Sequence, residues 1–374
     1  MTDEERSAAI SKISSGSGWG DMSERQKNQA IYALKNASDA EIQLIEKTFD
    51  GVSVVDGHGR RSRGVSGSTA WYTRGTGLIT MDQEHMEKPE TMWHEYGHYL
   101  DDPESSGMSA GTTKLLGTVY KNSLSQSVVD AKILHNDAAA KDVQRILDEE
   151  ASGRFRVESS GGNMLRVFDT EKGEYVDDSA DMSWEYHLSQ AFSKRSMEYR
   201  LKDNEYEDFL KSIGYPTEDE VPKRLDYIES YTTPKRGIRR EREKFKGAEE
   251  EYHNKLVEYN ERVEKALNEH GDEYYEQRKA YEKRIDERSR DVADASDIMD
   301  GIMRGQGPWA VWGSHGKDYY AEMSAPAKEA VANYHQMRVM GRTGGIEFLR
   351  SLVPSVVDGL ESAYNEWLWR NVDV

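Results

Sequence analysis

The chain contains no cysteine among its 374 residues. This absence excludes a disulfide framework and any metal site built from thiolates, so a bound metal would need histidine and carboxylate ligands. No apolar run approaches the roughly 20 residues that a membrane-spanning helix needs. The N-terminus, Met1 to Arg6, is acidic and lacks the apolar segment of a secretory signal. We therefore expect a soluble protein that is cytoplasmic at synthesis.

Basic residues are outnumbered by acidic ones, with 50 Lys and Arg against 69 Asp and Glu and a net charge of −19. General affinity for a phosphate backbone requires clustered Lys and Arg, so nucleic-acid binding is not expected. A chain of 374 residues is too long for one small core. It predicts either two domains or one domain with a large insertion.

Histidine is also scarce, with ten in the chain, but two of them lie in the stretch His94-Glu95-Tyr96-Gly97-His98. This stretch fits the pattern H-E-x-x-H. Residues four apart share one face of a helix, so His94 and His98 can present ring nitrogens to a single ion. A catalytic zinc keeps one position for water, and Glu95 lies where it can take a proton from that water. The pattern predicts a zinc site, the alternative being an ordinary helix with two surface histidines.

The residues around this pattern predict a buried helix that follows a strand. Pro89 and Glu90 favour a helix N-terminus, and a broad apolar surface follows at Met92, Trp93, Tyr96, Tyr99 and Leu100. Strands are predicted upstream at 52–55, 69–73 and 77–82. The sequence therefore predicts a small sheet packed on the helix that carries the two histidines.

Residues 235–292 form the second conspicuous feature. Apolar side chains recur there at spacings of three, four and seven, with Glu, Lys and Arg densely placed between them. This spacing predicts a long helix with coiled-coil character or an antiparallel helical hairpin, in which His270-Gly271-Asp272 closes one helix and caps the next. The apolar stripe must pack on itself, on residues 183–213, or on a partner chain. Self-association or a protein partner through 235–292 is thus expected.

A zinc ion held by two histidines needs a third protein ligand. The nearby metzincin pattern fails, because Asp101 stands where it requires glycine and Glu104 where it requires His or Asp. The third ligand must come from elsewhere in the chain, and a glutamate on a second helix is the usual alternative. A helix with Ser324 as N-cap and Pro326 in its first turn is predicted after a stretch rich in Gly, Trp and Tyr.

The stretch His94 to Asp102, which reads H-E-Y-G-H-Y-L-D-D, resembles the zinc helix of zincin metallopeptidases of the anthrax lethal factor type. In that family a tyrosine and then an E-x-x-A segment follow, and the glutamate of this segment is the third zinc ligand. Glu329-Ala330-Val331-Ala332 resembles that segment, which implies Glu329 as the ligand. Glu322 is the rival candidate. Tyr320 or Tyr319 stands in the position of the family's transition-state tyrosine.

The chain is also similar to metallopeptidases encoded by phages and prophages. Their W-G-H-G-x-x-Y-Y and E-A-F-A-N patterns resemble 312–320 and 329–333, although Ser314-His315-Gly316 replaces the usual Gly-His and Val331 replaces an aromatic residue. The resemblance covers about 50–105 and 295–360. It implies virion proteins as further partners and the virion as a further location.

Two more residues are candidates for supporting roles. His315 is either a donor to the substrate or transition state, or a loop histidine with an ordinary hydrogen bond. Asp102 lies four residues beyond His98 and either orients an imidazole from behind the ligands or closes the helix surface.

Together these features predict an α+β fold, predominantly α, in which a zincin-like domain with a small sheet is interrupted by a long helical insertion. The predicted parts are 1–135 with the H-E-x-x-H helix, 136–292 as the insertion, and 293–374 with the third ligand. The predicted function is a Zn²⁺-dependent peptidase acting on proteins or peptides, with Glu95 as general base and Tyr320 as oxyanion donor. The alternatives are a virion-associated assembly protein that keeps a peptidase fold, and a zinc amidase acting on peptidoglycan.

Overall fold

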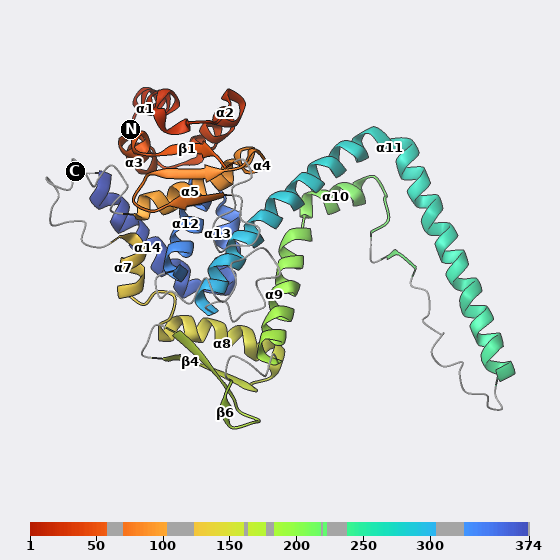
Figure 1. The fold of residues 1–374 in the computed structure, drawn as a ribbon. Helices are drawn as coiled ribbons and strands as arrows, with labels where there is room; N and C mark the ends of the chain where they lie inside the picture. Colours follow the sequence, from red (N-terminus) through yellow and green to blue (C-terminus); the bar gives the residue numbers. More distant parts are fainter. Residues whose placement is uncertain are drawn as a thin grey trace. The chain divides into compact units, whose positions relative to one another are not determined.

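The chain forms two compact units, one comprising Met1–Met197 with Arg288–Val374 and the other Glu198–Glu287. The computed structural model describes residues 1–57, 70–102, 123–160, 164–176, 183–217, 220–222, 238–303 and 325–372 (Figure 1). The smaller unit lies within the predicted insertion, 136–292, of which 136–197 and 288–292 belong to the larger unit.

Three short helices open the larger unit: α1 (Asp3–Ser15), α2 (Glu24–Ala33) and α3 (Asp39–Thr48). Both α2 and α3 begin with a capping box. The side chains of Ser23 and Ser38 accept hydrogen bonds from the backbone three residues on, and the side chains of Gln26 and Glu41 accept from the backbone of the caps. The buried side of α2, which includes Ala30, packs on α5.

The first sheet consists of β1 (Ser53–Asp56), β2 (Ala70–Thr73) and β3 (Leu78–Met81) in the order β1-β3-β2. The three predicted strands are thus confirmed. β3 pairs in parallel with β1 and antiparallel with β2. Because β3 is central, both of its edges are already hydrogen-bonded, and it cannot accept an extended peptide. Among the described strands, this leaves β1 and β2 at the edges of the sheet.

The first sheet packs on one of two helices that contact each other in the larger unit. α5 (Pro89–Asp101) contacts β2 and β3 as well as helix α12 (Ala325–Val339), which comes from the far end of the chain (Figure 1). The other helices of the larger unit are α4 (Gln83–Met86), α7 (Leu124–Asp130), α8 (Asp137–Ala151), α9 (Ser183–Leu201), α13 (Thr343–Leu352) and α14 (Pro354–Val372). Of these, α13, α14 and α7 pack on α12, so that nearly all of its side chains are buried.

A second antiparallel sheet lies beside α8. It contains β4 (Phe155–Ser160), β5 (Met164–Asp169) and β6 (Glu174–Tyr175) in the order β4-β5-β6. β4 and β5 form an antiparallel hairpin, and β6 adds a short third strand. The pair Arg154–Asp169 joins the outer ends of β4 and β5 through an ion pair of 2.7 Å.

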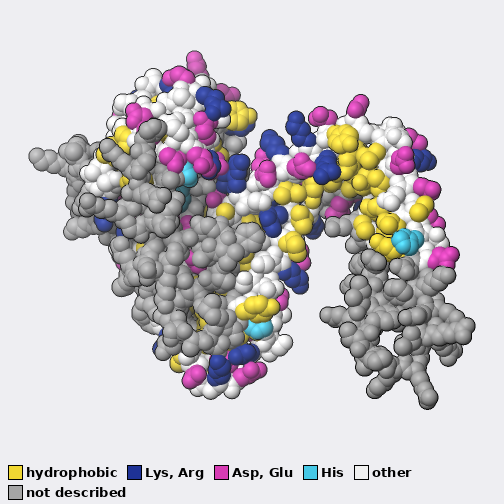
Figure 2. Space-filling model, turned by 45° about the vertical axis from the view of Figure 1, so that its right-hand side comes forward, with side chains coloured by type: hydrophobic (Ala, Val, Ile, Leu, Met, Phe, Trp, Pro, Cys, Tyr) yellow, Lys and Arg dark blue, Asp and Glu magenta, His cyan; other side chains and the backbone are white. Residues whose placement is uncertain are grey.

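The smaller unit is helical and contains α10 (Asn204–Ser212) and most of α11 (Ile238–Met303). The two alternatives predicted for 235–292 are each confirmed in part. Helical residues run from Ile238 to Met303, but His270 leaves helical geometry (φ −132°, ψ 21°), so a kink joins two helical segments at the predicted break. Helical geometry resumes directly after His270, so the helical segments on its two sides remain continuous in sequence. Tyr206 stacks on Tyr281 with ring centroids 4.4 Å apart. Figure 2 shows hydrophobic side chains gathered along this unit among intermixed acidic and basic ones.

The observed fold is mainly helical α+β with two small three-stranded sheets, as predicted at this coarse level. None of the described helices is both long enough and apolar enough to cross a membrane.

Candidate metal centre

Three buried aromatic side chains fix the rotation of α5. Trp93 Nε1 donates a hydrogen bond to the carbonyl of Ala30 at 3.2 Å. Tyr96 Oη and Thr48 Oγ1 lie 2.6 Å apart, and the Tyr99 hydroxyl donates to the Thr48 carbonyl at 2.9 Å. Buried polar groups need such partners, so each bond selects one rotation of the helix. With these aromatics directed into the core, the face that carries His94 and His98 is directed at α12.

A close backbone approach brings α12 to that face. A Cβ atom built on Gly97 would lie 2.9 Å from the Cα atom of Ala332, closer than real Cβ contacts. Only glycine therefore fits at position 97 without moving one helix. The small residues at this crossing allow Glu329, one turn before Asn333 on α12, to reach the histidine pair.

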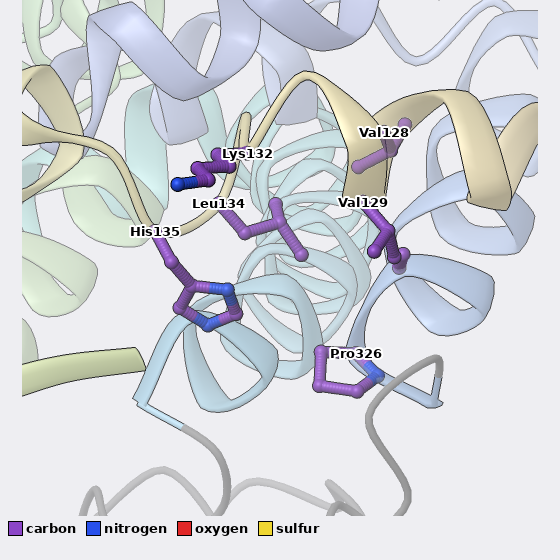
Figure 3. Close-up of a pocket in the computed structure, with 7 residues that line it drawn as sticks. Val128, Val129, Lys132, Leu134, His135 and Pro326 are labelled. Carbon is purple, nitrogen blue, oxygen red and sulfur yellow. The ribbon is translucent and has the colours of Figure 1, made fainter. Parts of the chain in front are cut away.

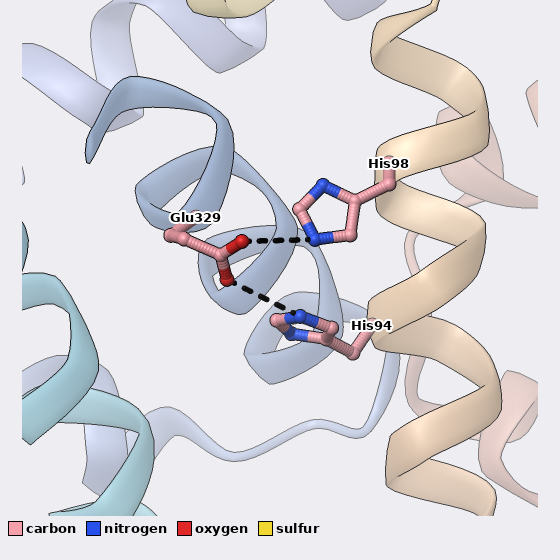
Figure 4. Close-up of side chains that lie close together, drawn as sticks. All are labelled: His94, His98 and Glu329. Carbon is pink, nitrogen blue, oxygen red and sulfur yellow. Dashed lines mark ion pairs between the residues drawn. The ribbon is translucent and has the colours of Figure 1, made fainter. Parts of the chain in front are cut away.

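The structure brings His94, His98 and Glu329 together, although the histidines and the glutamate are more than 230 positions apart in the sequence (Figure 4). His94 Nε2 lies 3.5 Å from Glu329 Oε2, and His98 Nε2 lies 3.3 Å from Glu329 Oε1. The two imidazole rings are nearly perpendicular, with an interplanar angle of 86°. The Glu329 side chain is 1% exposed and each histidine side chain 16%, so the group is open only on the histidine side.

These distances fit a tetrahedral metal ion. Two ligand atoms that each lie about 2.0–2.1 Å from a tetrahedral zinc are about 3.3 Å apart. The two separations between histidine and glutamate, 3.3 and 3.5 Å, are close to that value, and each ends on a different oxygen of the Glu329 carboxylate. Two neutral imidazoles and one carboxylate are also a donor set that zinc accepts, with a fourth position left for water. Within the described part of the chain, this is the group of three that can hold a metal ion.

The electrostatics of the group favour a cation. Burial by itself lowers the pKa of His94, but the neighbouring carboxylates, Glu329 foremost, together outweigh burial and raise it to about 10. Glu95, which is 7% exposed, contributes in the same direction. Without a metal, a proton on His94 therefore supplies the positive charge that Glu329 requires. A divalent ion bound by the neutral imidazoles would replace that proton.

Asp102 has the second of its two predicted roles. Its Oδ2 accepts hydrogen bonds from the Tyr72 hydroxyl and the Gly75 backbone, both at 2.8 Å, and Arg74 Nε lies 3.6 Å from its Oδ1. These contacts fasten the end of α5 to β2 and the turn that follows it. Asp102 thus closes the helix surface against the sheet.

The other predicted site residues lie outside the described residues. They are Tyr319, Tyr320, Glu322 and His315. The proposed roles of the two tyrosines, and of His315, stay predictions. The placement of Glu329 beside both histidines supports its choice as third ligand over Glu322.

A small cavity lies near the beginning of α12 and is lined by Val128, Val129, Lys132, Leu134, His135, Pro326 and Ala327 (Figure 3). Its volume of about 10 Å³ is close to the minimum for one water molecule. It therefore cannot serve as a substrate pocket for the metal group.

The sequence analysis missed several polar residues that border the group. Asp294 and Asp297 of α11 contact Gln336 and Asn333 of α12, the helix of Glu329. The signal was present as aspartates at every third position, 291, 294, 297 and 300, in a segment otherwise rich in Ala, Ile and Met. Such spacing indicates a polar stripe on a helix. Gly97 was also missed, because nothing in the sequence reveals which backbone approaches it.

Comparison of the chain with protein-family models, with curated proteins and with solved structures gives no match. The functional evidence is therefore the geometry and chemistry of His94, His98 and Glu329 themselves.

Proposed function

We propose that this protein is a zinc-dependent metallopeptidase that hydrolyses peptide bonds. The observation that carries the proposal is the convergence of His94, His98 and Glu329 at separations suited to one tetrahedral ion. A second support is the position of Glu95, next to the first ligand in the H-E-x-x-H pattern. The resemblance to zincins of the lethal factor type agrees with both.

In this proposal each residue has a defined task. His94 and His98 bind through Nε2, and Glu329 supplies the anionic ligand. When bound, zinc supplies Lewis acidity toward the substrate carbonyl and lowers the pKa of a water molecule to near 7. Glu95 takes the proton of the attacking water and passes it to the leaving amine. Tyr320, or Tyr319, donates a hydrogen bond to the developing oxyanion.

The substrate we propose is an extended protein or peptide segment. Such a segment can add to a sheet edge through backbone hydrogen bonds. β3 is the central strand, so its edges are not free for such pairing. β2 is an edge strand and is hydrogen-bonded to the residue that ends α5, which makes it the strand that we propose for this role. Phage virion proteins remain proposed partners.

The test is a comparison of the parent protein with Glu95→Gln. The parent should contain about one zinc per chain and cleave an unfolded protein substrate. Glu95→Gln should keep its zinc and lose activity by about 10²-fold or more, because it lacks the proton acceptor. A parent protein that binds no zinc, or a variant with undiminished cleavage, contradicts the proposal.

A second candidate function is assembly through α11. Its described surface exposes large apolar side chains, including Val257 (55% exposed) and Tyr275 (64% exposed). An assembly protein would form stable oligomers that Glu95→Gln leaves intact, and it would show no hydrolysis. Light scattering of both proteins, beside the cleavage assay, separates these functions. The amidase alternative predicts release of peptides from peptidoglycan in preference to cleavage of unfolded protein.

A further inference from the structure

The face of α12 that carries Glu329 continues into two polar residues. Asn333 and Gln336 lie four and seven positions after Glu329, so all three share one face of the helix. Asn333 Nδ2 donates to Asp297 Oδ2 at 2.7 Å and to the Glu329 carbonyl at 3.1 Å. Gln336 Nε2 donates to both oxygens of Asp294, at 3.1 and 3.0 Å. The ligand face of α12 is thus hydrogen-bonded to α11.

The same segment of α11 reaches the histidine helix. Glu90 lies four positions before His94, on the ligand face of α5. Its Oε1 is 3.4 Å from Arg290 of α11, and its Oε2 is 3.9 Å from Arg342. Arg342 also forms a 2.7 Å ion pair with Asp294, and both of these side chains are only 12% exposed. Contacts this well buried are little screened by solvent.

Directional contacts matter here because the direct interface between α5 and α12 has few. It is a close crossing of Gly97 on Ala332, and α12 is rich in alanine. Apolar contacts are non-directional, so polar contacts add to the fit of Gly97 on Ala332 in selecting one rotation of α12 about its axis. Beside those to α11, α12 has the ion pair Arg338–Glu41 at 3.2 Å and the contact of His335 with Tyr364. A shift of one residue rotates a helix by about 100°, which would carry Glu329 away from the imidazoles.

We infer that Asp294 and Asp297 of α11 are positioning residues for the metal centre, which set the rotation of α12 through Gln336 and Asn333 and thereby aim Glu329 at the histidine pair. We call these four residues the α11–α12 polar contacts. The inference rests on the proposed metal site. It assigns no role in the chemistry to any of the four. The charge of Asp297 also acts on His94 directly, so the test must separate that charge from the hydrogen bond.

The test compares two substitutions at one position. Asp297→Ala and Asp297→Asn both remove a negative charge, but the amide oxygen of asparagine still accepts the hydrogen bond from Asn333. Any difference between them therefore reports the hydrogen bond and not the charge. Asp286→Ala, an exposed aspartate elsewhere in α11, is the matched control.

Two measurements separate positioning from a merely structural role. Zn²⁺ affinity is measured by competition with a chromophoric chelator, and ligand geometry by the visible spectrum of the Co²⁺-loaded protein. We expect Asp297→Ala to weaken Zn²⁺ binding by about tenfold or more and to alter the Co²⁺ bands. Asp297→Asn should stay close to the parent in both, and Asp286→Ala should equal the parent.

An affinity and a Co²⁺ spectrum equal to the parent's in Asp297→Ala would overturn the inference. If Asp297→Ala does not fold, Gln336→Leu removes the hydrogen bonds to Asp294 at similar side-chain volume. The same two measurements on that variant then support or overturn the inference. A parent protein that binds neither ion contradicts the proposed function instead. A parent that binds zinc, together with variants that bind it equally well, contradicts only the positioning role.

Discussion

Gly97 and Ala332 set the distance between the two helices that carry the candidate metal ligands. The position that a Cβ would occupy on Gly97 is 2.9 Å from the Cα atom of Ala332 and 3.3 Å from its carbonyl oxygen. Both atoms belong to the backbone of α12, so they cannot move aside as a flexible side chain would. The separation of His98 and Glu329 therefore depends on the absence of a side chain at position 97.

Gly97→Ala should accordingly separate α5 from α12. We expect Zn²⁺ affinity to fall by about tenfold or more, and the free energy of unfolding by about 1–3 kcal/mol through overpacking. Chelator competition and denaturant unfolding measure the two effects.

Gly271→Ala is the matched control, since a Cβ there meets nothing within 4 Å. In a helix this change should leave zinc binding unaltered and stabilise slightly, by up to about 1 kcal/mol. Equal zinc affinity in Gly97→Ala and the parent would show that the approach of the helices does not determine the site.

The third ligand can be identified by two glutamine variants. Glu329→Gln removes the anion that lies 3.3 Å from His98 and 3.5 Å from His94. We expect its Zn²⁺ affinity to fall by more than about 100-fold, beyond the loss typical of residues outside the ligand set. Glu322→Gln should keep the affinity of the parent. The reverse pattern would establish Glu322 as the ligand and remove the basis of the present assignment.

Much of this centre was predictable because it depends on short-range rules. The spacing of His94 and His98 places both on one face of any helix. Capping boxes indicate where a helix begins, and alternating apolar residues indicate a strand. Glu329 was predictable only through a resemblance, since no local rule links residues so distant in sequence. The structure places it within reach of both histidines.

The remaining features could not be predicted because they depend on which elements meet. The central place of β3 in its sheet could not be predicted, because its pairing with β1 joins segments that are distant in sequence. The glycine after His270 suggested a helix end, yet the helix continues with a kink. Likewise, the role inferred for Asp294 and Asp297 of α11 could not be predicted, because it depends on their hydrogen bonds with Gln336 and Asn333 of α12.

Removal of the metal should destabilise the larger unit. A ligand that binds only the folded state, at a free concentration 100 times its dissociation constant, stabilises by about 2.7 kcal/mol. A chelator should therefore lower the melting temperature by several degrees, and added Zn²⁺ should restore it. His98→Ala should melt at one temperature with and without zinc. A parent protein whose melting does not respond to Zn²⁺ would contradict the presence of a metal site.

His335 is a buried histidine of α12, and its burial predicts a loss of stability in acid. Burial lowers the pKa of His335 from 6.5 to about 4. Its Nδ1 lies 2.8 Å from the Tyr364 hydroxyl, while its Nε2 has no hydrogen-bond partner among the described residues. A proton added at Nε2 would thus be buried without an acceptor. The folded state excludes this proton, whereas the unfolded chain binds it below about pH 6.5.

Because the unfolded state binds more protons between pH 6.5 and 4, the contribution of His335 to stability is full above pH 6.5 and decreases as the pH falls. The decrease should be about 1.4 kcal/mol per pH unit, or about 3 kcal/mol in all. Asp101 and Asp294 act in the opposite direction, since burial raises the pKa of each carboxyl to about 6. A difference between two variants is therefore needed to isolate the histidine.

His335→Gln keeps a polar side chain at this position but cannot titrate. Denaturant unfolding of chelator-treated parent and variant at pH 7.5, 6 and 5 gives the difference in free energy of unfolding at each pH. The free energy of unfolding of the parent, relative to that of the variant, should decrease steadily below pH 6.5. Only the parent loses the contribution of a neutral buried imidazole. Asp101 and Asp294 are present in both proteins, so their effects cancel. A difference that stays constant with pH would mean that His335 titrates alike in the folded and unfolded states.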